Sequence, residues 1–555
     1  MADAPARRFL FEGKARASAP NETLLTALAE DGLPLVQRSI RYHRPRGPMC
    51  GAGYCTGCLV RVNGRPNVRA CRYVPAESDV VTTENSWLSP RFDVYGVFDF
   101  LFPGGIDTLH GFRRPAWATP WYHRVIRRLA GYGEPPDPAA ATVATPPPLR
   151  RSVDVAVVGG GTSGRAAAAR LLSHGLRPWV LDRRLSLPSV PDVEVAPATT
   201  VSFLPPRDPA QSSGFTLLGY EEPNRGVSIS ARTVVVATGS YDGSLLFAGN
   251  DRPGVLTGDG ALALAPPGRR PPFHHAVLVG SDARADFLLG QLADHVDAIV
   301  APGAIPPQLA RHASEEEVPL FPRTLLVRAS GRRRVRSVDL RARGSGAVFS
   351  LDCDAVILAH RRLPTPQLFF QAGAKMEWRA GTGAYYPVVT DAGETSVPGL
   401  FAVGSAAGVT PAGSAASGER AADAIAGRPS SDTSPLPRVV RDGPSELEGY
   451  YRELWRTPHS GKWVACPCED VLLSEVEEAH ARGYRGIEVI KRYTGLGTGL
   501  CQGRFCLPDA LLVLAMLEER PPSEVGYITQ RPPVVPTPLA ALGALDQPAA
   551  PTGVP

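Results

Sequence analysis

A glycine-rich stretch with four cysteines constrains this chain more than any other feature. The cysteines are Cys50, Cys55, Cys58 and Cys71, in the spacing C-x4-C-x2-C-x12-C. Glycines at 51, 53 and 57 lack a Cβ, so the backbone can wrap closely around an object and direct its N–H groups inward. A [2Fe–2S] cluster requires four thiolates with nearby donors, and C-x4-C-x2-C is the plant-type ferredoxin spacing. A zinc knuckle usually has two separate short-spaced pairs, and a disulfide framework implies secretion, so the motif favours an iron–sulfur cluster.

A second group of four cysteines lies near the C-terminal end. These are Cys466 and Cys468, a C-x-C pair, and Cys501 and Cys506, a C-x4-C pair 32 residues further on. They bracket a helical stretch predicted at 474–482, which indicates a second [2Fe–2S] site or a structural zinc. The spacing leaves both open, and the other redox features favour iron–sulfur. The ninth cysteine, Cys353, stands alone in a strand-like run and is predicted to be a small core residue.

A dinucleotide-binding fingerprint opens a new domain at Val153. The strand-like run 154–158 leads directly into Gly159, Gly161, Thr162, Ser163 and Gly164, and a helix-forming run follows. A GxGxxG between a strand and a helix permits a tight turn and close approach to a pyrophosphate at the helix N-terminus. The next strand ends at Asp182, 18 residues beyond Gly164, where an acid would bond ribose hydroxyls. A glycine-rich surface turn is the alternative, and the context argues against it.

Two further strand-and-turn segments fit a flavoprotein with two dinucleotide-binding folds. One ends in Ala237, Thr238 and Gly239, and the other in Gly404 and Ser405 before a helix predicted near 416–426. Between them, 276–285 is a second βαβ candidate that keeps only the first fingerprint glycine, Gly280, and its next strand ends without an acid. A Rossmann-like fold is predicted there, but NAD binding is not supported. His274 and His275 are predicted to be loop residues and not catalysts.

These features predict an α/β chain with α+β parts and several domains, as expected for 555 residues. The fold classes are a β-grasp ferredoxin-like domain, a Rossmann-like FAD domain of the two-dinucleotide type, and a small helical cysteine domain. The predicted ranges are 1–90 for the ferredoxin-like domain, 91–150 for a connector and linker, 151–426 for the FAD domain with its second subdomain at about 270–360, 427–445 for a linker, 446–520 for the C-terminal cysteine domain and 521–555 for a Pro-rich tail, disordered or lying on a partner.

The local pattern of the first module is that of a β-grasp. The runs 9–16 and 59–63 alternate like strands, and 21–30 reads as a short helix with Asn21 as its N-cap. The aromatic and Arg-rich stretch 91–132 is expected to pack on a neighbour.

Composition excludes several classes of function. The chain is 43% hydrophobic and 20% charged with a net charge of only +5, and its arginines are dispersed, so no nucleic-acid face is predicted. No window approaches 18 uninterrupted apolar residues, so no membrane span is expected. The start has no sustained apolar run of a signal peptide, and clustered cysteines in such a chain indicate metal sites in a reducing cytoplasm. Peripheral attachment to the inner membrane face is the alternative location.

Three motifs resemble one family of bacterial oxidoreductases. They are the runs CGAGYCTGC at 50–58, FAGNDRPGV at 247–255 and GLCQGRFC at 499–506. The chain resembles the α-subunits of sarcosine oxidase, opine oxidase, hydrogen cyanide synthase and dye-linked proline and hydroxyproline dehydrogenase complexes, over nearly all of 9–510. The resemblance implies an α-subunit with FAD and one or two [2Fe–2S] clusters, and a separate amine-oxidase-type β-subunit that oxidises the substrate C–N bond. Relatives carry Asp where Ser405 stands, and an Arg-rich segment replaces the usual glycines after Asp182.

The working hypothesis is an electron-transferring subunit of an amine or amino-acid dehydrogenase or oxidase complex. Electrons would pass from a partner flavoprotein through FAD and clusters to a quinone or other acceptor, and no residue of this chain is predicted as a catalytic acid or base. A self-contained NAD(P)H:acceptor oxidoreductase is the second hypothesis. A scaffold that holds clusters without FAD, prompted by Ser405, is the third.

Overall fold

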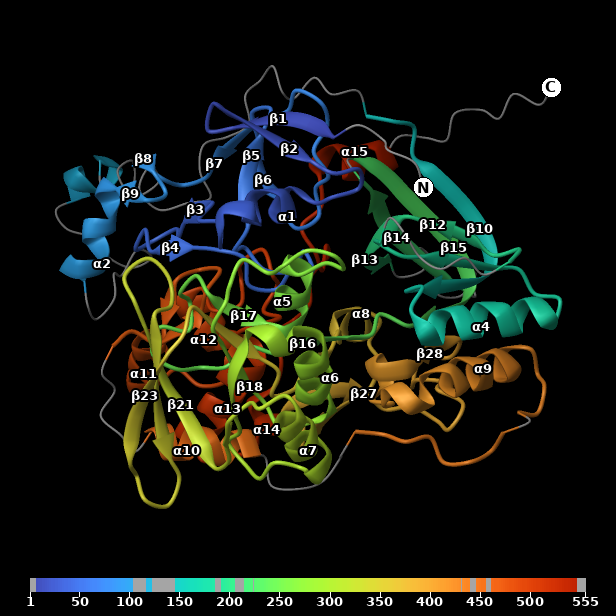
Figure 1. The fold of residues 1–555 in the computed structure, drawn as a ribbon. Coiled ribbons are helices and arrows are strands. Elements are labelled where there is room, and N and C mark those ends of the chain that lie inside the picture. Colours follow the sequence, from blue (N-terminus) through green and yellow to red (C-terminus); the bar gives the residue numbers. More distant parts are fainter. Residues whose placement is uncertain are drawn as a thin grey trace. The chain divides into compact units, whose positions relative to one another are not determined.

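The computed structural model describes residues 6–102, 116–121, 145–184, 191–204, 214–222, 224–430, 432–439, 446–455 and 461–546. Its elements form two compact units (Figure 1). The first comprises Met1–Thr142, Asp242–Arg362 and Glu446–Ile528, and the second comprises Val143–Tyr241, Leu363–Ser445 and Thr529–Pro555. Most of the predicted connector at 91–150 lies outside the described residues, apart from short elements such as α2 (Val97–Leu101).

A five-stranded sheet forms the N-terminal part of the first unit, in the order β2-β1-β7-β5-β6. The strands are β1 (Arg7–Phe11), β2 (Lys14–Ser18), β5 (Leu59–Val62), β6 (Arg65–Arg69) and β7 (Val80–Thr83). β1 pairs antiparallel with β2 and parallel with β7, which is the mixed sheet of a β-grasp. The run predicted as one strand at 9–16 is a hairpin, because Glu12 and Gly13 both have positive φ.

Helix α1 (Leu24–Leu28) buries its leucines against this sheet. Its N-cap is Thr23, whose hydroxyl accepts from the backbone N–H of Thr26 at 3.3 Å, so the prediction of Asn21 as N-cap was wrong. Asn21 instead has φ +62 in the turn before the helix. Any of Asn, Ser or Thr can cap a helix, so composition alone could not choose between the two positions.

A parallel sheet forms the middle of the first unit, in the order β17-β24-β18-β19-β20. Its strands are β17 (Val255–Thr257), β18 (Ala276–Val279), β19 (Val296–Val300), β20 (Leu320–Phe321) and β24 (Ala355–Leu358), with helices α5 (Gly258–Leu264), α6 (Ala283–Leu292) and α7 (Pro307–Glu315). Leu256, Ala261 and Leu278 belong to the same hydrophobic core as Leu24 and Cys58. The β-grasp and the Rossmann-like subdomain therefore share one core.

An antiparallel sheet and a set of helices complete the first unit. The sheet is β21 (Thr324–Ser330), β22 (Ser337–Ala342) and β23 (Val348–Asp352). The C-terminal helices are α10 (Glu446–Trp455), α11 (Leu473–Ala481), α12 (Ile487–Thr494), α13 (Leu507–Glu518) and α14 (Pro522–Val525), beside the short pair β29 (Val464–Cys466) and β30 (Val471–Leu472). Cys353 is buried just after β23, and burial together with nearby carboxylates raises its pKa to about 12, as expected of a core thiol.

The second unit is built on a seven-stranded sheet of Rossmann type. Its order is β12-β11-β10-β15-β14-β13, with β28 beside β15. The strands are β10 (Leu149–Val158), β11 (Pro178–Leu181), β12 (Glu194–Ala196), β13 (Ala198–Leu204), β14 (Phe215–Glu221), β15 (Arg225–Val236) and β28 (Leu400–Ala402). Helices α4 (Thr162–Ser173) and α9 (Ser414–Ile425) pack side by side (Figure 1). The predicted α/β fold class is confirmed.

The Pro-rich tail is more ordered than its composition indicates. The apolar run at 539–546 forms helix α15 (Leu539–Asp546), and Ala541 is fully buried with Tyr220 of β14. The expectation of a disordered tail was therefore wrong for this run, because an Ala- and Leu-rich segment gains from burial against the chain's own sheet. In the described part of the chain, every helix is too short or too polar to cross a bilayer.

Candidate functional site

The first cysteine quartet lies in the loop between β4 (Pro45–Arg46) and β5 and in the turn after β6. All four side chains are buried, with 2–6% of their surface exposed. Backbone N–H groups point at the sulfurs: Cys55 N–H donates to Cys50 Sγ at 3.3 Å, and Gly57 N–H donates to Cys55 Sγ at 3.4 Å. A Cβ at Gly57 would lie 2.2 Å from the carbonyl oxygen of Gly47, so no side chain fits at this position of the loop.

The sulfurs of this quartet meet in two pairs. Cys50 shares a hydrogen bond with Cys55, and Cys58 shares one with Cys71. Burial opposes ionisation of Cys50, but hydrogen bonds from Cys55 and backbone N–H groups lower its pKa to about 6. The hydrogen bond to Cys71 and burial raise the pKa of Cys58, to which the other three cysteines also contribute. The four thiols are thus close enough to influence one another's ionisation.

The second quartet has the same two-by-two arrangement. Cys468 shares a hydrogen bond with Cys501, and Cys466 shares one with Cys506. The bond to Cys468, with backbone N–H groups of Phe505 and Gly503, lowers the pKa of Cys501 to about 7 against the opposing effect of burial. All four side chains are 1–4% exposed. Among the described residues, no three His, Cys, Asp or Glu side chains converge as ligands of a single ion.

The loops that carry the two cysteine quartets are in direct contact with one another. The hydroxyl of Thr56, between Cys55 and Cys58, hydrogen-bonds the thiol of Cys468. A cavity of about 30 Å³ lies between the two loops and is lined by residues from both, among them Cys55, Gly57 and Phe505. The guanidinium of Arg504 lies over the ring of Tyr54, 4.5 Å from its centroid. One hydroxyl and one cation–π contact therefore join the two cysteine quartets directly.

A network of buried ion pairs lies next to the contact between the two cysteine loops. Arg46 bonds Asp251 and Asp470 with its two terminal nitrogens, and Arg44 bonds Asp251 at 2.7 Å. Arg41 pairs with Glu475 at 2.7 Å. Burial opposes ionisation of Asp251, yet the neighbouring arginines lower its pKa below the ordinary value. The network ties the N-terminal module to the central and C-terminal segments of the unit.

The fingerprint in the second unit forms a tight cradle. A Cβ at Gly164 would lie 1.9 Å from the carbonyl oxygen of Gly159, and one at Gly159 would lie 2.3 Å from that of Ala237. A Cβ at Gly161 would meet nothing within 4 Å. The turn is therefore tightly packed at Gly159 and Gly164 and open at Gly161. Helix α4 begins directly after Gly161, with Thr162 and Ser163. Open space at the start of a helix is what close approach of a pyrophosphate requires.

Asp182 lies beside this glycine turn, and both oxygens of its carboxylate accept hydrogen bonds. Its Oδ2 accepts from Gly160 N–H at 2.7 Å, and the Arg184 guanidinium bonds both oxygens at 3.0 and 2.8 Å. Burial would raise the pKa of this carboxyl, but the Arg184 bonds and the backbone bonds lower it. The predicted ribose acceptor thus has a cation partner that the motif did not indicate.

The other predicted cofactor residues lie at the ends of β15 and β28. Thr238 follows β15, and its hydroxyl bonds that of Thr365. Gly404 has φ +62, and a Cβ there would lie 2.1 Å from Ser163 Oγ. A Cβ at Gly239 would lie 3.8 Å from Ser405 Oγ, so the two turns face one another. The strands β10, β15 and β28 thus bring the predicted residues of the second unit to one edge of the sheet.

In the Rossmann-like subdomain of the first unit, the N-terminus of helix α6 differs from that of α4 in the second unit. The carboxylate of Asp282 caps α6 by accepting from the N–H groups of Arg284 and Ala285 at 3.0 and 3.3 Å. Arg284 in turn bonds Asp242 and Asp259. Helix-terminal donors that would bind a pyrophosphate are thus already bonded to a carboxylate.

The sequence predicts the eight clustered cysteines and the glycine turn as site residues, and the structure groups them as two cysteine quartets and one turn before α4. The sequence patterns missed Thr56, the Arg44–Arg46–Asp251–Asp470 network and Arg184. Asp251 lies inside the motif at 247–255, which was the available signal, but its partners Arg44 and Arg46 are more than 200 residues away in the chain. No local pattern reports such a pairing.

Two family models match the chain, and both fall on a cysteine quartet. A 2Fe-2S iron-sulfur cluster binding domain matches residues 6–86, and a sarcosine oxidase A3 domain matches residues 460–546. The chain is 27% identical to the sarcosine oxidase α-subunit of Rhizobium meliloti (strain 1021), over 96% of this chain and 57% of that protein. It is also 27% identical to the opine oxidase A-subunit of Agrobacterium tumefaciens (strain Ach5), over 64% of this chain and 78% of that protein.

Over most of its length the chain is similar to sarcosine oxidase α-subunits and opine oxidase A-subunits. It spans little more than half, 57%, of the length of the sarcosine oxidase protein. The L-proline dehydrogenase from P. horikoshii has the same fold, with a TM-score of 0.66 at 20% sequence identity over 98% of both chains. The predicted resemblance is confirmed, as are the 2Fe-2S domain and the FAD-type fold.

Proposed function

We propose that this chain is the electron-transferring subunit of an amine or amino-acid dehydrogenase or oxidase complex. The observation that carries the proposal is the direct contact between two quartets of buried cysteines. Within each quartet the thiols form two hydrogen-bonded pairs. Two pairs suit two irons, since each iron of a [2Fe–2S] cluster takes two cysteines, whereas zinc takes all four on one ion. The proposed ligands are the eight cysteines of the two quartets.

FAD is the proposed cofactor of the second unit. The residues that would hold it are those of the cradle and the facing turns: Gly159, Gly161, Thr162, Ser163, Gly164, Asp182, Ala237, Thr238, Gly239, Gly404 and Ser405. A flavin exchanges two electrons and each cluster exchanges one, which is the chemistry these groups supply when bound. Ser405 offers a hydrogen bond without charge, and Arg184 orients the Asp182 carboxylate.

The proposed partner is an amine-oxidising flavoprotein that holds the substrate. The names of the relatives, which are single subunits of sarcosine oxidase and of opine oxidase, support a complex of several chains. The substrate class we propose is a secondary amine or amino acid of the sarcosine, opine, proline or glycine type, and the proposed acceptor is a quinone or another carrier. The rival NAD(P)H-oxidising function is disfavoured because Asp282 occupies the helix terminus of the second Rossmann-like subdomain.

The function is tested by following reduction of the clusters. The chain is co-expressed with a candidate amine-oxidising partner, purified without oxygen and mixed with sarcosine, proline or an opine while EPR spectra are recorded. We expect reduced-cluster signals with one of these amines only when the partner is present. Signals that develop with NADH alone would establish the rival function, and no response to any amine in the intact complex would refute the proposal.

The cradle makes a separate prediction about flavin. Replacing Gly164 by Ala puts a Cβ 1.9 Å from the Gly159 carbonyl oxygen, so the turn must open and we expect most bound flavin to be lost. The control is Gly543→Ala in α15 of the same unit, where a Cβ meets nothing within 4 Å. Flavin absorbance per chain is measured with iron content, which both variants should retain. Full flavin in Gly164→Ala would contradict the proposed site, and absence of flavin from the unaltered protein would favour the cluster-holding scaffold.

A further inference from the structure

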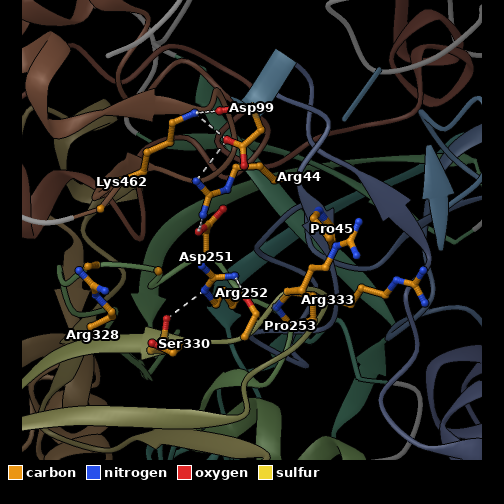
Figure 2. A pocket seen from close by; sticks show the side chains of 16 residues that line it. Arg44, Pro45, Asp99, Asp251, Arg252, Pro253, Arg328, Ser330, Arg333 and Lys462 are labelled. Atoms are coloured by element: carbon orange, nitrogen blue, oxygen red, sulfur yellow. Dashed lines mark hydrogen bonds and ion pairs between the residues drawn. The ribbon is translucent and has the colours of Figure 1, made fainter. Parts of the chain in front are cut away.

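A second cavity of the first unit lies outside the residues used so far for cofactor binding. It has a volume of about 440 Å³ and is bounded by the segments 44–45, 248–253, 328–333 and 461–462 (Figure 2). The charged side chains around it come from the N-terminal module, the central sheet and the C-terminal segment. They are the cations Arg44, Arg252, Arg328, Arg332, Arg333 and Lys462 and the acids Asp99 and Asp251.

Both acids are already paired with cations. Asp251 is bonded by Arg44 at 2.7 Å and also by Arg46, which does not line the cavity. Asp99 accepts from Lys462 at 2.6 Å and lies 3.6 Å from Arg44 (Figure 2). The carboxylates thus neutralise Arg44 and Lys462 but leave little negative charge for the remaining arginines.

Three further cations, Arg252, Arg332 and Arg333, give the cavity an excess of positive charge. Arg252 donates to the backbone carbonyls of Ala329, at 2.9 Å, and Gly331, which carry no formal charge. Arg328 also lines the cavity, and its Nε lies 3.9 Å from the carboxylate of Asp339. Among the described residues, Arg332 and Arg333 have no carboxylate within ion-pair distance. Burial lowers the pKa of Arg252; the charges of Asp251 and Asp99 counteract this effect, and those of Arg44 and Arg328 add to it.

We propose that this cavity binds a small, multiply charged phosphate anion. A space of 440 Å³ has the size of a small-molecule site and not of a protein groove. Guanidinium groups present paired N–H donors that match phosphate oxygens, and here they converge from separate segments of one unit. A phosphate with two or more negative charges offsets the excess of cations, which a single carboxylate does not.

The experiment compares two pairs of arginines in one loop. Arg332 and Arg333 line the cavity, whereas Arg334 and Arg336 in the same loop between β21 and β22 do not. Binding of inorganic pyrophosphate, adenosine monophosphate and citrate to the purified full chain is measured by calorimetry at low salt. The pyrophosphate and nucleotide arms separate a free inorganic anion from a phosphate carried on an organic group, and citrate tests whether any polyanion suffices.

We expect one phosphate-bearing ligand to bind with a stoichiometry of one per chain. Arg332→Gln/Arg333→Gln should weaken this binding at least tenfold, as loss of charge-assisted contacts implies, while Arg334→Gln/Arg336→Gln should change it less than twofold. Unaltered thermal unfolding of both variants excludes a folding defect. Absence of saturable binding, equal losses in both variants, or equal affinity for citrate would each overturn the proposal.

Discussion

Replacing Cys468 by Ser is expected to remove one of two iron–sulfur clusters while the other stays in place. Each [2Fe–2S] cluster holds two irons, so the anaerobically purified protein should contain about four irons per chain and the variant about two. Cys468 is the residue to change because its thiol bonds both Cys501 within its own quartet and Thr56 of the other. Loss of this ligand leaves three thiolates and a weaker oxygen donor for the second cluster.

Metal analysis with EPR of the reduced protein measures this result. Cys353→Ser is the matched control, because this buried thiol lies outside both quartets and its loss should leave the iron content unchanged. One zinc and about two irons per chain in the unaltered protein would show that the C-terminal quartet is a structural zinc site. A variant that keeps all four irons would remove Cys468 from the set of ligands.

Replacing Asp470 by Ala is expected to cost the protein about 3–5 kcal/mol of stability, the usual penalty for leaving a buried charge without its partner. The Asp470 side chain is fully buried. Its carboxylate bonds Arg46 and accepts the backbone N–H groups of Arg41 and Tyr42 at 2.9 and 3.2 Å. The variant leaves the Arg46 guanidinium with Asp251 alone, and it leaves the buried N–H of Tyr42 and the partly buried N–H of Arg41 without this acceptor.

Equilibrium or thermal unfolding of the first unit is the measurement. Glu448→Ala is the control, since the Glu448–Arg452 pair is largely exposed and such pairs contribute about 0–1 kcal/mol. Equal destabilisation by the two changes would mean that the buried network contributes no more than a surface pair. A double change of Arg46→Met and Asp470→Ala should recover part of the loss, because no unpaired charge then remains at that point.

Local sequence patterns predicted those parts of the site in which the relevant residues are neighbours in the chain. The loop from Cys50 to Cys58 and the turn from Gly159 to Gly164 each place their chemistry within a few residues, so spacing and glycines are sufficient. The pairing of sulfurs across 468 and 501, and the Thr56–Cys468 contact, depend on tertiary packing. The local pattern of residues around one loop does not indicate which distant loop will contact it in the folded chain.

The errors have the same origin. Asn21 and Thr23 are both competent N-caps, and the structure uses the one whose hydroxyl faces Thr26. Prolines dominate the pattern of the tail, but the run at 539–546 between them is apolar and packs against β15. Arg184 follows Asp182 closely in sequence, yet only the backbone turn after β11 brings its guanidinium back onto that carboxylate.

The first unit is assembled from three stretches of chain, with the last of them ending at Ile528. During synthesis the segment from Cys50 to Cys71 leaves the ribosome long before the C-terminal cysteines are made. For most of translation Thr56 therefore lacks Cys468, the residue that it contacts in the finished chain. Domains usually fold in order as they emerge, but the complete first unit cannot form before its third stretch has been made. Iron loaded before release would therefore enter a half-built and solvent-exposed N-terminal loop, and we expect maturation of both centres to wait for the finished polypeptide.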